Sequence, residues 1–143
     1  MDFIKPNKLP FRLSQFVPMC EALKYKYILY IDGHCASARY TYLLKTGAVI
    51  LRTLSLETIM GTDLWYFPKL VHYDFSQADN TQADHFLVAE DFSNLKGLIE
   101  WLRVNDNVAR QVSQNAVRFY NQHLSKVALM EYVSERLNGE PFK

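Results

Sequence analysis

The chain has 143 residues, of which 49% are hydrophobic and 22% are charged, a balance that is ordinary for one globular domain with a core of its own. Its net charge of +1 provides no basic field of the kind that binds nucleic acid. No apolar run approaches the ~20 residues of a membrane span, and the start of the sequence, MDFIKPNKLP, lacks the apolar region of a signal peptide. The sequence therefore predicts no nucleic-acid partner and no membrane span, and it leaves the localisation unknown.

The two cysteines, Cys20 and Cys35, do not form a CxxC motif. They are expected to be free buried thiols rather than a disulfide, although the sequence leaves pairing open.

The first half of the chain alternates apolar runs with helix-compatible segments. Residues 1–11 contain two prolines and are expected to form an irregular lead-in, and Pro18 makes the segment Leu13–Leu23 ambiguous. The elements predicted next are a buried strand at Tyr25–Ile31, a helix at Ser37–Lys45 that stops at Gly47, and a strand at Gly47–Thr53.

The middle of the chain has weaker patterns. Ser55–Leu64 is expected to be a short helix or a loop, and short strands are predicted at Leu70–Tyr73 and Phe86–Val88. The polar segment Phe75–Ala83 between these strands is expected to be a surface loop that is dispensable for folding, because it adds no apolar periodicity.

The last third of the chain predicts three helices with apolar stripes at helical spacing. Asp91 or Ser93 is expected to cap the first helix, Asn105 or Asp106 the second, and Ser125 the third, which should stop at Gly139. The stripes, all expected to face inward, are Leu95, Leu98, Ile99 and Leu102; Val108, Val112, Ala116, Phe119 and Tyr120; and Leu129, Val133 and Leu137.

Strands that alternate with helices predict an α/β fold with a Rossmann-like, mostly parallel sheet flanked by helices. The expected sheet has at least four strands, with Tyr25–Ile31 at its centre because this run is apolar throughout.

The turn after the first predicted strand is the most informative part of the sequence. Asp32 and Gly33 end the strand, with Asp32 expected to cap the turn, and small side chains follow up to Arg39. Such a turn would let a phosphate approach unpaired N–H groups at a helix start, and Arg39 could add a charge-assisted contact. The pattern indicates a nucleotide-phosphate site formed by His34, Cys35, Ala36, Ser37, Ala38 and Arg39.

A simpler interpretation stays open for the same residues. The segment could be an ordinary strand, turn and helix with a surface arginine at position 39. Ser37 could equally be the N-cap of the helix, and His34 an exposed histidine in the turn.

Several short blocks follow one another in a set order along most of Leu13–Tyr120. They are Lys24-Tyr25-Lys26-Tyr27; Gly33, Ala36, Ser37, Arg39 and Tyr40; Gly47-Ala48-Val49-Ile50-Leu51; Trp65-Tyr66-Phe67-Pro68 with Leu70; Asp84-His85-Phe86-Leu87-Val88; Asp91-Phe92-Ser93-Asn94-Leu95; and Trp101 with Asn105-Asp106. Their order resembles glycosyltransferase family 90, the family of the protein O-glucosyltransferases and the fungal capsule-associated proteins. Compared with that family, Phe75–Ala83 is an insertion.

The resemblance implies that residues 1–143 form a single donor-binding lobe similar to the C-terminal lobe of a GT-B glycosyltransferase, with residues 125–143 as its last helix and tail. It implies a nucleotide-sugar, UDP-linked, as donor substrate, a protein or glycan hydroxyl as acceptor, and Arg39 as the pyrophosphate contact. Transfer in the family needs no metal cofactor, and no Asp-x-Asp motif occurs here.

In the family an acceptor lobe precedes the donor lobe and supplies an aspartate base, and Met1–Leu23 is too short to be that lobe. The catalytic residues are therefore unknown, a separate N-terminal lobe is a candidate partner, and no transfer is expected from this chain alone. A non-catalytic nucleotide-sugar-binding or assembly module, and an unrelated small α/β protein, remain as alternatives.

Other side chains are weaker candidates for a function. Asp84-His85 is expected to support the residues that contact the ligand without contacting it directly. Glu57 and Asp63 could bind ribose or sugar hydroxyls, but they are better explained as solvated carboxylates. The histidines at positions 72, 85 and 123 do not have a metal-ligand spacing. Trp65, Tyr66 and Phe67 could stack on a base, but core packing is favoured for at least two of them.

Overall fold

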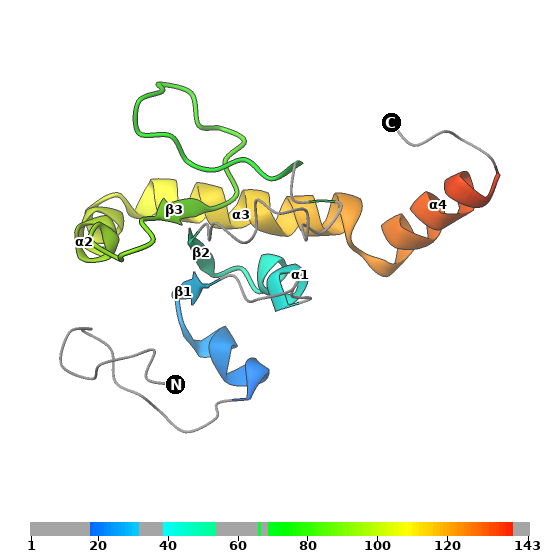
Figure 1. Cartoon of the computed structure of the whole chain (residues 1–143), viewed down its shortest axis with the longest axis horizontal. Helices are drawn as coiled ribbons and strands as arrows, with labels where there is room; N and C mark the ends of the chain where they lie inside the picture. The colour runs from blue at the N-terminus through cyan, green and yellow to red at the C-terminus, as the bar shows by residue number, and fades with distance from the viewer. Residues whose placement is uncertain (1–17, 32–38, 54–65, 67–68, 139–143) are drawn as a thin grey trace.

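The computed structural model describes residues 18–31, 39–53, 66 and 69–138 (Figure 1). In chain order the elements are a 3-10 helix (Met19–Lys24), β1 (Tyr27–Tyr30), α1 (Arg39–Leu44), β2 (Val49–Thr53), β3 (Phe86–Val88), α2 (Leu95–Val104), α3 (Asp106–His123) and α4 (Lys126–Leu137). None of the helices in the described ranges is both long and apolar enough to cross a membrane.

The three strands form one parallel sheet in the order β1-β2-β3. The register pairs Tyr30 of β1 with Arg52 of β2, and Thr53 of β2 with Val88 of β3. Every residue of β2 is buried, as expected for a strand with neighbours on both sides and helices on both faces. The α/β fold with a parallel sheet flanked by helices is thereby confirmed.

The predicted place of the first strand is wrong. Within the described residues the sheet has three strands rather than four or more, and β1 lies at its edge while β2 is central. An apolar run indicates that both faces of a strand are covered, and this holds for β1, because Ile28 packs in one core cluster and Tyr27 and Leu29 pack against the other. It does not indicate how many strands lie beside it.

Two core clusters lie on opposite faces of the sheet, because side chains alternate along each strand. Tyr30 and Ile50 pack with α1 on one face, whereas Leu51 and Phe86 pack with α2 on the other. The helix α3 contributes to both, with its first half on the α2 side and its second half on the α1 side.

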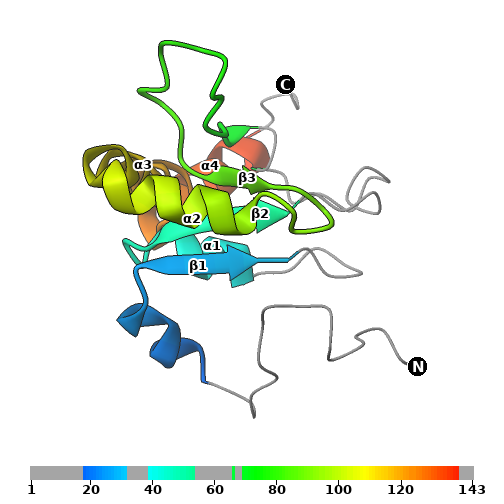
Figure 2. The same ribbon diagram turned by 90° about the vertical axis from the view of Figure 1, so that its left-hand side faces the viewer.

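The helix α3 also closes the amino end of the sheet (Figure 2). The Ser113 hydroxyl donates to the Gly47 carbonyl at 2.7 Å, just before β2, and the Asn115 amide donates to the Ala83 carbonyl at 2.8 Å, just before β3. An ion pair joins Asp106 to Lys26, just before β1. The opposite end, at which all three strands finish, is therefore the end available for loops.

The last helix differs from its prediction. The three residues expected to face inward, Leu129, Val133 and Leu137, are all exposed, and none of the twelve residues of α4 is buried. Figure 1 shows α4 beyond the end of α3, away from the sheet. The apolar stripe was read correctly as helical, but periodicity does not reveal whether a partner surface lies opposite the stripe.

Helix ends and short strands were predicted unevenly. Ser125 caps α4 as expected, accepting from the Ala128 amide at 3.3 Å, and Gly47 takes the left-handed conformation expected after α1. The predicted caps of α2, Asp91 or Ser93, are wrong, because Asn94 holds its N-cap position. Asn105 holds the N-cap position of α3, as one of the two predicted residues, but its side chain makes no capping hydrogen bond.

The predicted strand at Leu70–Tyr73 reduces to a single parallel bridge between His72 and His85. Cys20 is a free thiol, as expected, but it is exposed rather than buried.

The segment Phe75–Ala83 is a polar surface loop with anchored ends. The Phe75 ring stacks edge-on against Trp101, with centroids 5.1 Å apart, and Ala83 is fully buried in the core. Between them the Asn80 amide accepts from the Asp74 N–H at 2.7 Å and donates to the Asp74 carbonyl at 2.9 Å. These contacts argue against removing the whole segment without loss of stability.

Candidate functional site

Ligands of parallel α/β sheets bind at the carboxyl ends of the strands. In this protein Arg39, the predicted phosphate contact, is the first residue of α1 and is exposed. The other residues predicted for the site, His34, Cys35, Ala36, Ser37 and Ala38, lie outside the described residues, as does the preceding Asp32-Gly33. Because α1 has only six residues, its dipole is small, and attraction of an anion would depend on the Arg39 guanidinium itself.

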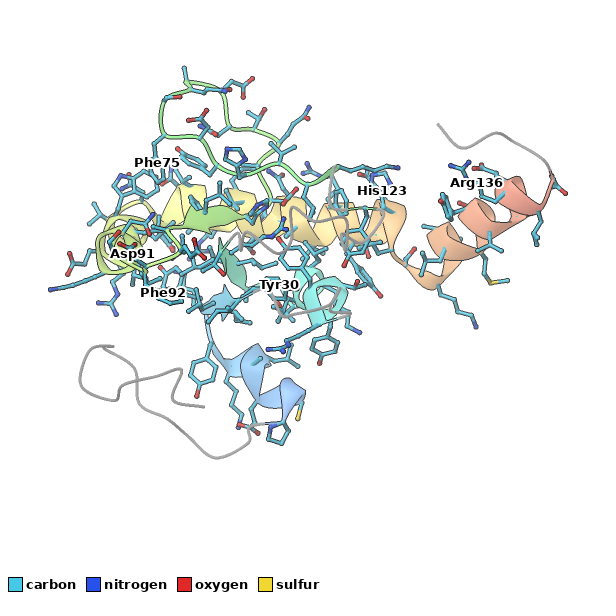
Figure 3. The ribbon with its side chains drawn as sticks, viewed as in Figure 1. Tyr30, Phe75, Asp91, Phe92, His123 and Arg136 are labelled. Carbon is cyan, nitrogen blue, oxygen red and sulfur yellow. The ribbon has the colours of Figure 1, made fainter. Side chains whose placement is uncertain are left out.

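A second arginine lies under the same end of the sheet. Arg52, near the end of β2, is only 5% exposed. Its guanidinium carbon is 5.4 Å from the centre of the Tyr40 ring, a cation–π geometry, and Tyr40 in turn packs edge-on against Tyr30 with centroids 4.7 Å apart. Figure 3 labels Tyr30 beside α1. A buried cation and two phenols in edge-on contact thus lie next to the start of α1.

The buried pair Asp84-His85 faces this group. One carboxylate oxygen of Asp84 lies 2.6 Å from Nδ1 of His85, and the other accepts from the Val71 N–H at 2.9 Å. Because a carboxylate accepts, His85 donates from Nδ1. The His85 ring lies perpendicular to the Tyr40 ring, with centroids 6.4 Å apart. The Tyr40 ring therefore contacts both Tyr30 and the His85 of this pair.

Burial sets the charge state of the groups in this cluster. It lowers the pKa of His85, an effect that the bond to Asp84 offsets only in part, so the imidazole is neutral at pH 7. Burial, with the charge of Asp84 as a second cause, raises the pKa of Tyr40 well above its usual range. Burial also raises the pKa of Tyr66, whose hydroxyl lies 2.6 Å from that of Thr41. Neutral aromatic groups thus surround the buried Arg52 and Asp84.

The arrangement fits the expected supporting role of Asp84-His85, which stays a prediction. Sequence reasoning did not single out Arg52, although an arginine inside the apolar run Ala48–Thr53 was a visible signal. Charged residues are rarely buried unless they are paired, so an arginine in a central strand indicates a polar cluster beneath the sheet end.

The remaining candidates are only partly covered by the described residues. Tyr66 is buried in the core, as favoured, whereas Trp65, Phe67, Glu57 and Asp63 lie outside the described ranges. The rings of His72 and His85 lie 6.4 Å apart, and His123 stands at the far end of α3 (Figure 3). Across the described part of the chain, no group of three or more His, Cys, Asp or Glu side chains could hold a metal ion.

A parallel sheet with helices on both faces places the protein among the α/β domains. The sequence matches glycosyl transferase family 90 over residues 5–139, and the chain therefore belongs to that family. The family predicted from the order of the short sequence blocks is confirmed.

The chain is only distantly similar to individual proteins. The chain is 32% identical to the uncharacterized protein 179R of Invertebrate iridescent virus 6 over 115 residues, which cover 79% of this chain and 9% of the viral protein. It is 26% identical to human protein O-glucosyltransferase 1 over 114 residues, which cover 76% of this chain and 24% of the human protein. The chain thus spans a quarter or less of the length of these relatives.

Proposed function

We propose that the chain is the donor lobe of a glycosyltransferase and binds a nucleoside-diphosphate sugar, UDP-linked, at the carboxyl end of its sheet. The observation that carries this proposal is the exposed Arg39, which opens α1 directly after the predicted phosphate turn. Membership of family 90 supports a sugar donor and an acceptor. The name of the human relative, protein O-glucosyltransferase 1, supports a hydroxyl of a protein as the acceptor class.

The chemistry proposed for the complete enzyme is a direct displacement. The acceptor oxygen attacks the anomeric carbon of the sugar while the bond from that carbon to the diphosphate oxygen breaks, and the bonding electron pair leaves with UDP. The acceptor proton passes to a carboxylate base of the acceptor lobe of the complete enzyme. In this reaction Arg39 stabilises the charge that develops on the leaving diphosphate.

The buried cluster beneath the site supports this role for Arg39. Tyr40, the next residue, is buried and contacts both Tyr30 and His85, so the first turn of α1 has little freedom to shift. A contact that stabilises a transition state needs such a preorganised position, because the protein then does not reorganise during the reaction.

Titration calorimetry with UDP and uridine tests the proposal. The chain should bind UDP weakly but more tightly than uridine, because the diphosphate supplies the charged contact. Arg39→Ala should weaken UDP binding by roughly 1.5–3 kcal/mol, the range for a hydrogen bond to a charged group. Arg39→Lys should recover part of the loss, since an ammonium cannot reproduce the planar fork of a guanidinium.

Arg110→Ala is the matched control, because Arg110 is an exposed arginine on α3 that pairs with Asp106 near the amino end of the sheet. It should leave UDP affinity unchanged. Equal UDP affinity in the wild type and both Arg39 variants, or a wild type that does not bind UDP at millimolar concentration, would remove the donor-site assignment.

A further inference from the structure

A polar cavity of about 320 Å³ lies between the second half of α3 and the segment that leads from Lys69 to β3. Figure 1 shows this segment passing along α3. The volume is at the lower end of the range for small-molecule sites, about 300–1,000 Å³. The side chains of Lys69, Gln82, Arg118, Gln122 and His123 line the cavity, and none of them belongs to the predicted donor site.

The position of Arg118 at this cavity is fixed by a buried side chain. Asn115 is only 5% exposed, and its amide nitrogen donates to the carbonyls of Thr81 and Ala83, both at 2.8 Å. These two bonds orient the Asn115 side-chain oxygen, which accepts from Arg118 at 3.1 Å. The bond uses one of the five N–H donors of the guanidinium. Within the described ranges, no carboxylate forms an ion pair with Arg118.

A second cation and an imidazole line the same cavity. The charge of Lys69, together with burial, lowers the pKa of His123, which shows that the ammonium group lies near the imidazole. The His123 ring packs against the ring of Phe119, with centroids 4.8 Å apart, at the end of α3 that Figure 3 labels. The cavity therefore gathers two positive charges and a histidine that an anion would help to protonate.

A buried carboxylate also borders the cavity but does not cancel these charges. Asp84 is 2% exposed, and its two oxygens accept from His85 and from the Val71 N–H. It is the one carboxylate among the described residues that line the cavity, against the two cations of Lys69 and Arg118. The excess of positive charge favours an anionic ligand.

We propose that this cavity binds the phosphate group of a small phosphate monoester. Arg118 and Lys69 hold the phosphate, and the side-chain amides of Gln82 and Gln122 contact the polar remainder of the ligand. A phosphate monoester carries a charge of about −1.5 to −2 at pH 7, which two cations match. A guanidinium held by one hydrogen bond keeps further donors for a bidentate contact, and an ammonium adds a point charge.

The test is an NMR titration of backbone amide signals with glycerol 3-phosphate, inorganic phosphate and glycerol at constant ionic strength. Glycerol 3-phosphate should cause saturable shifts concentrated around the cavity, at Lys69, Gln82, Arg118 and Gln122. Inorganic phosphate should bind more weakly because it lacks the part that the amides contact, and glycerol should not bind. Arg118→Ala and Lys69→Ala should each weaken binding by about 10-fold, the lower end for a hydrogen bond to a charged group.

Arg110→Ala is the matched control, because it removes one positive charge from an exposed position of the same helix. It should leave the affinity for glycerol 3-phosphate unchanged. Arg39→Ala should leave it unchanged as well, which separates this site from the proposed donor site. Lys69 and Arg118 are both exposed, so either variant decides the question if the other is unstable.

Three results would overturn the inference. Shifts scattered over the surface, or absent from the cavity, would mean that no site exists there. An equal loss of affinity in Arg110→Ala and Arg118→Ala would mean that the anion responds only to net charge. Equal affinities for inorganic phosphate and glycerol 3-phosphate would remove the assignment to a monoester.

Discussion

The two ends of the sheet use similar side chains for different purposes. At the amino end, Asn115 on α3 is buried and its amide donates to the carbonyls of Thr81 and Ala83, both at 2.8 Å. At the carboxyl end, Asn94 is exposed and holds a turn that presents carboxylates to solvent. A buried amide satisfies backbone groups that water cannot reach, whereas an exposed one mainly restricts shape. Changes at the amino end should therefore reduce stability, and changes at the carboxyl end should reduce binding.

The largest expected effect on stability comes from Asn115→Ala. This change leaves the buried Ala83 carbonyl without its side-chain donor, which costs about 1–3 kcal/mol, and it removes the bond to the carbonyl of the exposed Thr81, which is worth about 0.5–1.5 kcal/mol. We expect the free energy of unfolding in urea to fall by roughly 2–4 kcal/mol, with unchanged UDP affinity in the folded protein. Asn121→Ala, an exposed asparagine on the same helix, should change stability by less than about 0.5 kcal/mol.

Either of two results would contradict the prediction that the amino end of the sheet serves stability and the carboxyl end serves binding. Wild-type stability in Asn115→Ala would mean that the amino end is not held by this side chain. Loss of UDP binding in the folded variant would mean that the two ends are coupled.

A smaller effect distinguishes α3, which closes the amino end, from α4, which packs on neither face. Val112 of α3 is 1% exposed, whereas Val133 of α4 is 51% exposed. Val112→Ala removes about two buried methylene equivalents and should lower the free energy of unfolding by about 2 kcal/mol. Val133→Ala should change it by less than about 0.5 kcal/mol. Urea unfolding of the two variants makes the comparison, and equal losses would mean that α4 is covered in solution.

The smallest effect is a dependence of stability on pH that arises at His85, which directly precedes β3. Burial lowers the pKa of His85 in the folded protein below the unfolded value of about 6.5. The contribution of His85 to the free energy of unfolding is fully present above pH ~6.5. It is lost as the pH falls, because the unfolded chain then binds a proton that the folded protein does not bind. The slope from this group is at most about 1.4 kcal/mol per pH unit and ends below the folded pKa.

His85→Gln isolates this effect, since glutamine can still donate to Asp84 but does not titrate. Burial and the charge of Lys69 also lower the pKa of His123, so the difference between wild type and variant, rather than the wild-type curve, measures His85. Hydrogen bonds also lower the pKa values of four aspartates, Asp74, Asp79, Asp91 and Asp106. These carboxyls change the stability only as the pH falls below about 4, so they do not interfere with the measurement of His85. Identical pH profiles for wild type and His85→Gln would contradict the prediction.

Local sequence patterns were sufficient for the order of the three strands and of the helices from α1 to α4, for the α/β class and for the family. The apolar run at Val49–Thr53, the left-handed Gly47 and the stripes of α2 and α3 are properties of neighbouring residues, and neighbours alone decide them. The order of the short blocks along the chain was specific enough to predict glycosyl transferase family 90.

Only the tertiary structure decided which apolar surfaces are covered and which polar groups are buried together. The stripe of α4 has the same periodicity as that of α3, yet it is exposed, because burial depends on what lies opposite a helix. Arg52, Asp84 and Tyr40 are far apart in sequence and meet only because parallel pairing and the packing of α1 bring three separate segments to one face. The positive φ of Phe92, 60°, has the same origin, since hydrogen bonds and core packing, rather than the preference of phenylalanine, determine its conformation.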